Sequence, residues 1–539
     1  MINIKGYYKL IIILQIIILI SIRLIYIILG GPKYILSSLT NDDSYYYINT
    51  AWNTKIYGFV TFDSFHKTNG VHFLWFFIVY ALSYLTNSKI VYLNIILFSN
   101  LIIMGFSFIP VYKFGKKIKN EYFGLILSTV WFIQLILYDI FFMGMENTIH
   151  NIIIWYIIFY LVKVLEKNDK NKKKSFLILT LLLVINIWVR YDSIIASSII
   201  YIIIIIYLSL YKKRLSFKII LMSAFLAISG LLILFITFYW MGDTFIPISA
   251  KIKLNSAQNT TFNNYLTNIF IIITPKIFFT DLGVGGLTLS RIFTIIFVVI
   301  NLKFLVDIIK KKEKDNKIKI ILLIISFSNL IYTILIGNLY NPYFIWYLSL
   351  SIIIWVILLS YILNLFIIKL TEKIRNFKKI KVSSYFEYNQ VIIFLVIIGV
   401  FVSLPFSVFL NIISDYYSEI RTSEFHFFRY NTALWLKKIK NPNIIVGSWN
   451  AGEIAFFSDR KVINLDGLVN DNNYFNTILS NNDKFNSTEF IEYLNKMNIT
   501  YLVDYKFYGF DPIQANFTLI KEFYYIVNSV QKNIQIWSR

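Results

Sequence analysis

The chain has 539 residues, of which 57% are hydrophobic and only 15% are charged. Soluble domains are closer to half apolar and a quarter charged, so this composition excludes an ordinary soluble protein and predicts a polytopic membrane protein. The formal net charge is +23, but Lys and Arg are concentrated in short segments between apolar runs, which indicates membrane topology rather than nucleic-acid binding. The absence of cysteine excludes disulfides, thiolate metal sites and a cysteine nucleophile.

Apolar runs of membrane-crossing length recur through residues 1–413. The first of them, Leu10–Leu29, is too long for a signal-peptide core and lacks a small-residue cleavage site, so we expect a membrane helix there. We expect about 11–13 transmembrane helices, drawn from candidate spans at 8–29, 71–86, 90–112, 122–142, 147–165, 176–190, 193–210, 216–240, 291–309, 318–338, 343–366 and 389–411.

Basic loops between these spans predict the orientation of the chain. Lysine-rich segments in short loops mark the cytoplasmic side, and here they are Lys113–Lys119, Lys163–Lys174, Lys212–Lys218, Lys303–Lys319 and Lys369–Lys381. This places the N-terminus in the cytoplasm and the loops 30–70 and 241–290 outside a plasma membrane. Two candidate spans separate residue 70 from residue 113, although an odd number of crossings is needed. Either 71–86 does not fully cross, or the first basic loop is an exception.

The composition changes after residue 413, and we expect an extracytoplasmic α/β domain over residues 414–539. Short apolar runs at 443–449, 461–467 and 499–505 predict strands, and the last residues alternate as two or three more. Ala451–Phe457 and Ser487–Met497 predict short helices between them. The predicted fold is therefore a helical membrane domain followed by a small domain on the outer face.

The stretch 41–75 interrupts the apolar pattern with a dense set of polar and aromatic residues. We expect a polar outer loop, because bare backbone cannot lie in hydrocarbon. Its adjacent acids, Asp42 and Asp43, can act as a general base on a hydroxyl or hold a divalent cation such as Mg²⁺ or Mn²⁺ through Asp43. Two solvated loop acids are the simpler alternative. The three tyrosines that follow, Tyr45, Tyr46 and Tyr47, are typical of an interfacial aromatic belt.

This arrangement resembles the first extracytoplasmic loop of GT-C fold glycosyltransferases, in particular the bacterial and archaeal members related to protein O-mannosyltransferases and lipid A aminoarabinose transferases. Other segments resemble family motifs in the same order along the chain: Gly144-Met145-Glu146-Asn147, Arg190-Tyr191-Asp192-Ser193, the loop from Gly242 through Pro247 to Lys251, and the tail stretch from Gly447 to Asn470. The resemblance implies a GT-C-like fold and an inverting transfer of a sugar from a polyprenyl-phosphate carrier to a glycan, lipid or protein acceptor at the outer membrane face.

The resemblance also implies roles for particular residues. The catalytic base would be Asp42 or Asp43, and Arg190 and Lys251 would stabilise the departing phosphate. Contacts to the donor would come from Glu146, His72 and Asp192.

Simpler alternatives exist for each of these side chains. Arg190 lies in an apolar stretch and needs a partner, so a structural pair with Asp192 is an equal alternative. Lys251 can instead be a snorkelling interfacial lysine, and Glu146 a helix N-terminal charge. For His72, a satisfied interfacial histidine is the simpler interpretation.

Two other classes of function fit the same composition. A glycolipid transporter or flippase would show interrupted helices, mid-membrane polar residues and two related halves, whereas the acids here lie in a loop. A non-catalytic assembly protein of the cell envelope would not require Asp42-Asp43, Arg190 and Lys251 to converge on one site.

Overall fold

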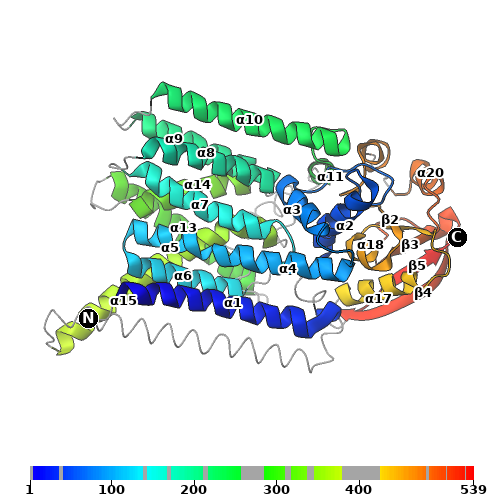
Figure 1. Cartoon of the computed structure of the whole chain (residues 1–539), viewed down its shortest axis with the longest axis horizontal. Coiled ribbons are helices and arrows are strands. Elements are labelled where there is room, and N and C mark those ends of the chain that lie inside the picture. The colour runs from blue at the N-terminus through cyan, green and yellow to red at the C-terminus, as the bar shows by residue number, and fades with distance from the viewer. Residues whose placement is uncertain are drawn as a thin grey trace.

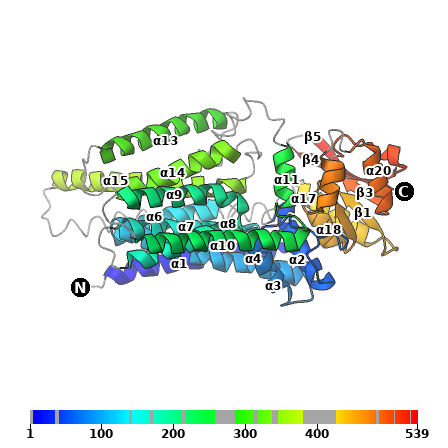
Figure 2. The same cartoon turned by 90° about the horizontal axis from the view of Figure 1, so that it is seen from above.

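Long apolar helices make up most of the molecule, and an α/β unit lies at one end of them (Figure 1). The computed structural model describes residues 4–34, 40–137, 142–166, 171–210, 216–256, 285–309, 317–336, 345–378, 425–480, 485–505, 507–527 and 530–539. The helices of the bundle lie side by side, and the N-terminal end of the chain is at the end of the bundle opposite the α/β unit (Figures 1 and 2).

The bundle consists of α1 (Ile4–Tyr34), α4 (Lys89–Phe106), α5 (Phe108–Ile118), α6 (Glu121–Leu137), α7 (Asn147–Leu165), α8 (Lys172–Val189), α9 (Ile194–Leu210), α10 (Phe217–Gly242), α13 (Gly285–Ile309), α14 (Lys317–Ile336) and α15 (Ser349–Lys378). Among the described residues, six helical segments are long and apolar enough to cross a membrane: Lys89–Ile118, Asn147–Leu165, Tyr191–Ser209, Phe217–Gly242, Ile318–Leu335 and Ser349–Lys369. The candidate span 389–411 lies outside the described residues.

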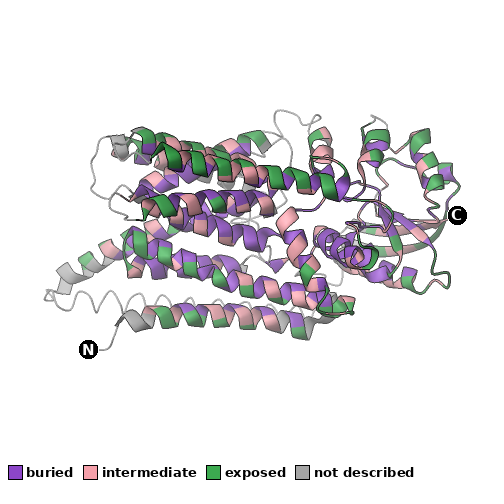
Figure 3. Cartoon of the chain, turned by 45° about the horizontal axis from the view of Figure 1, so that its top comes forward, coloured by how far each residue is buried: buried purple, intermediate pink, exposed green. Residues whose placement is uncertain are grey.

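Burial differs between the centre and the edge of the bundle (Figure 3). Most of α7 is buried, whereas α10 presents exposed apolar side chains such as Phe225 and Ile236. Exposed apolar side chains on a long helix are expected where the solvent is lipid rather than water. The bundle is therefore a membrane domain whose peripheral helices face hydrocarbon.

Helix α3 (Phe73–Ser83) resolves the inconsistency in the crossing count. It has 11 residues and so spans about 16 Å, well short of the hydrocarbon thickness of about 30 Å. Of the two alternatives that the sequence left open, the structure supports the first, that 71–86 does not fully cross. The next segment, Lys89–Ile118, is 30 residues long and supplies the single crossing between the polar stretch and the first basic loop.

The polar stretch itself is largely helical, which corrects the expectation of a loop at its start. Helix α2 (Asp42–Tyr57) begins after Asn41, whose side chain accepts a hydrogen bond from the backbone N–H of Asp43. The hydroxyl oxygen of Ser44 in turn accepts from the backbone N–H of Asn41. This capping box, with two acids in the first turn, stabilises the helix N-terminus. Tyr45, Tyr46 and Tyr47 are buried, so they do not form an interfacial belt.

The C-terminal unit is a five-stranded mixed sheet of order β2-β1-β3-β5-β4. Its parallel strands are β1 (Ile445–Ser448), β2 (Lys461–Asn464) and β3 (Tyr501–Asp504), and β5 (Val530–Ser538) runs antiparallel to both β3 and β4 (Thr518–Val527). The helices are α17 (Phe425–Lys437), α18 (Gly452–Ser458), α19 (Asn472–Tyr474) and α20 (Thr488–Lys496). Short helical turns lie at Phe475–Leu479 and Pro512–Ala515. The predicted strands and both predicted helices of this region agree with these elements.

Two glycines allow the C-terminal unit to pack closely against the polar stretch. A Cβ added at Gly452 would stand 2.2 Å from the backbone oxygen of Asp42, and one added at Gly70 would stand 1.8 Å from that of Leu468. Only a residue without a side chain permits backbones to approach this closely. The contact holds α2 between the bundle and the C-terminal unit.

Candidate active site

A cavity of about 430 Å³ lies where α2, the beginning of α3, the ends of α7 and α8, and helix α11 (Ile248–Ser256) meet. It is lined by Asp43, Tyr46, Tyr47, Gly70, Val71, His72, Met145, Glu146, Arg190, Tyr191, Ser249, Lys253, Tyr347 and Leu468. Four residues selected from the sequence therefore converge on one cavity, namely Asp43, His72, Glu146 and Arg190. The other three, Asp42, Asp192 and Lys251, do not line it.

Asp43 presents a carboxylate to this cavity from the first turn of α2. No hydrogen bond or ion pair joins that carboxylate to any other residue that the structure describes. Burial raises the pKa of Asp43 to about 6, with the positive charge of Lys253 opposing the shift and the acids Asp42 and Glu146 adding to it. The side chain is therefore a carboxylate available to a ligand, with a pKa suited to proton transfer near neutral pH.

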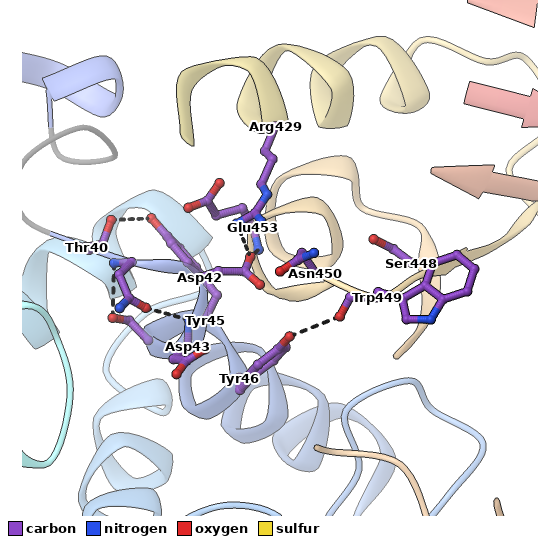
Figure 4. A network of polar contacts seen from close by, with 12 residues as sticks. Thr40, Asp42, Asp43, Tyr45, Tyr46, Arg429, Ser448, Trp449, Asn450 and Glu453 are labelled. Atoms are coloured by element: carbon purple, nitrogen blue, oxygen red, sulfur yellow. Dashed lines mark hydrogen bonds and ion pairs between the residues drawn. The ribbon is translucent and has the colours of Figure 1, made fainter. Parts of the chain in front are cut away.

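Asp42 has a different environment although it is the adjacent residue (Figure 4). Its Oδ1 accepts the backbone N–H of Glu453 at 2.9 Å and lies 3.4 Å from Nη1 of Arg429. These partners belong to α18 and α17, so Asp42 attaches α2 to the C-terminal unit. The sequence left open which of the two acids faces a substrate. In the structure, Asp43 lines the cavity and Asp42 does not.

Arg190 is held in a buried cluster of charges at the end of α8. Its Nη1 lies 3.1 Å from Oε1 of Glu146, and its Nε and Nη2 donate to the two carboxylate oxygens of Asp192 at 3.1 and 2.9 Å. Tyr332 donates to Asp192 at 2.7 Å. Two acids balance this one cation, so the geometry favours the structural pair over a guanidinium left available to bind phosphate.

His72 lies beside the same cluster at the start of α3. Its ring packs on Tyr47 and Tyr191, and its Nε2 is 3.6 Å from Oε1 of Glu146. Burial and the nearby charge of Arg190 hold the pKa of His72 well below its usual value. The imidazole is therefore neutral and lines the cavity as a polar aromatic side chain.

The sequence motif selected Lys251 as a cation of the site, but the lysine that lines the cavity is Lys253. Lys251 donates to Oδ1 of Asn472 at 2.7 Å, on the side of the C-terminal unit. Lys253 lines the cavity and donates to the hydroxyl of Tyr347 at 2.7 Å. Residues two apart on an α-helix point about 200° apart, so only one of them can face the cavity. Recognising this segment as helix α11 rather than loop would have signalled Lys253.

A second cavity of about 510 Å³ adjoins the first, sharing Arg190 and Tyr347. Its other lining residues are mainly apolar side chains of the bundle, such as Ile154, Ile158 and Ile200. A mainly apolar cavity therefore lies beside the polar one, with Arg190 and Tyr347 between them.

The described residues do not form a cage of protein ligands around a divalent cation. Within the described ranges, no group of three or more His, Cys, Asp or Glu side chains is arranged to hold a metal ion. Asp43 and Glu146 are the carboxylates that line the cavity, and Mg²⁺ is usually held by one or two carboxylates together with substrate phosphates. A divalent cation bound through Asp43 therefore stays a prediction.

This chain, a membrane helix bundle with a polar cavity beneath an α/β unit, has the GT-C class of fold. The apo oligosaccharyltransferase of Archaeoglobus fulgidus superposes with a TM-score of 0.54 at 11% identity, over 93% of this chain and 70% of that one. The oligosaccharyltransferase AglB of the same organism, in complex with an inhibitory peptide and a dolichol-phosphate, gives 0.52 at 12% identity, over 98% and 74%.

ArnT from Cupriavidus metallidurans bound to undecaprenyl phosphate gives a TM-score of 0.49 at 9% identity, over 99% of this chain and 98% of that one. No curated protein matches the chain in sequence. A family model described as a domain of unknown function (DUF8728) matches residues 416–537.

Proposed function

We propose that the protein is an inverting glycosyltransferase that moves a hexose or pentose from a polyprenyl-phosphate carrier to a hydroxyl of a glycan, lipid or protein of the cell envelope, at the outer face of the plasma membrane. The observation that carries this proposal is the ligand-accessible carboxylate of Asp43 in a cavity that also contains the ammonium of Lys253. The GT-C fold and the adjoining apolar cavity support a prenyl-linked donor.

The reaction is a single displacement at the anomeric carbon. The acceptor oxygen forms a bond to that carbon as the bond from the carbon to the phosphate oxygen breaks, and the configuration inverts. The acceptor proton passes to the carboxylate of Asp43, and the bonding electron pair leaves with the polyprenyl phosphate. Lys253 is placed to stabilise the phosphate charge, and positioned charges of this kind act most strongly in partly dehydrated sites.

Sugar transfer from defined donors tests the proposal. Membranes containing the full chain are incubated with radiolabelled undecaprenyl-phosphate and dolichyl-phosphate sugars, and label is followed into lipid, glycan and protein fractions. We expect one donor class to be consumed with formation of product of inverted configuration. Failure of a broad donor panel, with the protein correctly inserted, would overturn the proposal.

The rate of transfer is expected to depend on pH through Asp43. A base with a pKa of about 6 is protonated below that pH and cannot accept the acceptor proton. We therefore expect kcat/KM to fall by about tenfold per pH unit below pH 6 and to level off just above it. A pH profile measured in detergent from about pH 4.5 to about pH 7.5 checks this. A flat profile through pH 6 would contradict the assignment of the base.

Lys253 and Lys251 form a matched pair for testing the phosphate contact. Losing a charge-assisted hydrogen bond costs about 1.5–3 kcal/mol, so we expect Lys253→Met to lower kcat/KM for the donor by about 10- to 100-fold. Lys251→Met removes the same charge from the opposite face of α11 and is expected to retain activity. An equal loss of kcat/KM in both variants would indicate that activity depends on the integrity of α11 rather than on a phosphate contact of Lys253.

A further inference from the structure

Asn69 is a buried side chain of the loop between α2 and α3, and it bonds the chain on both sides of the turn from α10 into α11. Its Nδ2 donates to the backbone oxygens of Phe238 at 3.1 Å and Thr244 at 2.8 Å. Its Oδ1 accepts the backbone N–H of Ile248 at 3.0 Å. These partners fix the orientation of the amide, because a flipped amide would present its NH₂ group to an N–H and its oxygen to two carbonyls.

The bond to Ile248 caps α11. Ile248 is the first residue of this helix, and the first N–H groups of a helix have no partner within it. The residue that usually precedes a helix is Ser, Thr, Asp or Asn, whose side-chain oxygen accepts one of these N–H groups. Pro247 precedes α11 and has no such oxygen. Asn69 therefore supplies an acceptor from a segment distant in the sequence.

The loop that carries Asn69 is itself held by close backbone packing. Gly242 ends α10, and a Cβ added there would stand 2.7 Å from the backbone nitrogen of Asn69 and 2.8 Å from its Cγ. Only glycine lets α10 lie this close to Asn69. On its other side the same loop packs through Gly70 against the C-terminal unit. Asn69 is thus a fixed point to which the start of α11 is attached.

Helix α11 carries two residues of the cavity wall, Ser249 and Lys253. The helix has nine residues and lies between the bundle and the C-terminal unit (Figures 1 and 2). A helix this short is not stable alone in water, so contacts with its surroundings decide its position. Lys253 lies five residues after Ile248, which is about 7.5 Å along the axis. A shift at the start of α11 therefore moves the Lys253 ammonium within the cavity.

We propose that Asn69 is a positioning residue, which sets the place of Lys253 by capping α11 and thereby the affinity of the site for the donor phosphate. The inference rests on the proposed glycosyltransferase function, in which Lys253 faces that phosphate. Asn69 touches no substrate and acts through the helix. Small displacements suffice for such an effect, since a misplacement of about 1 Å can cost about 100-fold in rate.

Binding of radiolabelled undecaprenyl phosphate to the purified full chain in detergent tests the inference. We expect Asn69→Ala to raise Kd by about 2- to 10-fold, the equivalent of one neutral hydrogen bond. Gly242→Ala should act similarly, because its methyl group displaces Asn69 although alanine favours a helix more than glycine does.

Asn49→Ala is the matched control for the loss of a buried amide. Asn49 is also buried and donates to the backbone oxygen of Phe62 at 3.0 Å, so it supports the same loop from α2. We expect Asn49→Ala to lower the unfolding temperature and to leave Kd unchanged. This comparison separates positioning of Lys253 from general support of the fold.

A double variant shows whether Asn69 acts through Lys253. Effects of independent sites add, whereas effects that pass through one group do not. We expect the variant with Asn69→Ala and Lys253→Met to bind undecaprenyl phosphate as weakly as Lys253→Met alone. A further 2- to 10-fold loss, about the effect of Asn69→Ala in the wild type, would show that Asn69 acts on something other than Lys253.

Hydrogen exchange measures the cap without any ligand. Loss of the acceptor for the Ile248 N–H should make the backbone amides of α11 exchange faster, by about 2- to 10-fold, in Asn69→Ala and Gly242→Ala. Asn49→Ala and Lys253→Met leave the cap in place, so their α11 amides should exchange as in the wild type.

Three results would overturn the inference: an unchanged Kd in folded Asn69→Ala, additive losses in the double variant, or unchanged exchange of α11. If Asn69→Ala does not fold, Gly242→Ala answers the same question. A wild type that binds undecaprenyl phosphate but transfers no sugar would overturn the proposed function and leave the role of Asn69 standing. Absence of binding by the wild type would overturn both.

Discussion

Replacing Asp43 by asparagine is expected to lower kcat for sugar transfer by about 10²–10⁴-fold, the usual contribution of a positioned general base. The amide retains the shape of the side chain but cannot accept the acceptor proton. Because no described residue bonds the Asp43 carboxylate, its loss should leave the folded structure intact. Sugar transfer by membranes that contain matched amounts of protein measures the loss of activity. Thermal unfolding in detergent shows whether the variant remains folded.

Asp42 provides the internal control for that result. Asp42→Asn removes the charge that faces Arg429 and weakens the bond from the backbone of Glu453. We expect Asp42→Asn to lower thermal stability and to loosen the C-terminal unit, while a measurable fraction of activity remains. The reverse pattern, a silent Asp43→Asn and an inactive but stable Asp42→Asn, would transfer the role of base to Asp42.

The sequence was sufficient for the membrane class and the elements of the C-terminal unit, because both depend on local patterns. The GT-C fold was predicted instead from the resemblance of several motifs, in their order along the chain, to a known family. Long apolar runs have one stable solution in lipid, and short alternating runs between turns predict strands. Helix α2 was missed because its composition is polar and aromatic, and it is buried on several faces by segments distant in sequence. No single apolar stripe marks such a helix.

The site was less predictable, because residues one or two positions apart in the sequence face different surroundings in the fold. Asp42 and Asp43 are adjacent, and their environments differ because the partners of Asp42 lie in α17 and α18, far along the chain. Lys251 fits the motif, but the helical phase of α11 gives the cavity to Lys253. Tyr46 and Tyr47 line the cavity and Tyr45 does not, and three consecutive tyrosines carry no local signal that separates them.

Arg190→Met is expected to destabilise the protein by about 3–5 kcal/mol, the cost of removing one partner from a buried ion pair. Methionine preserves much of the side-chain volume, so the loss is mainly electrostatic: Glu146 and Asp192 would remain buried without their cation. Thermal unfolding in detergent and the yield of folded protein measure the effect. We expect a large loss in both, because the cluster joins η3 (Tyr191–Ser193) to the start of α7.

The competing interpretation, that Arg190 binds the donor phosphate, makes the opposite prediction. In that case Arg190→Met would raise the donor KM and leave the unfolding temperature unchanged, as we expect for Lys253→Met. A triple variant, Arg190→Met with Glu146→Gln and Asp192→Asn, neutralises the two acids together with the cation. We expect it to recover part of the lost stability, because no uncompensated charge then remains buried. Recovery of stability would identify the cluster as structural, and it would leave Lys253 as the cation of the described cavity that faces the phosphate.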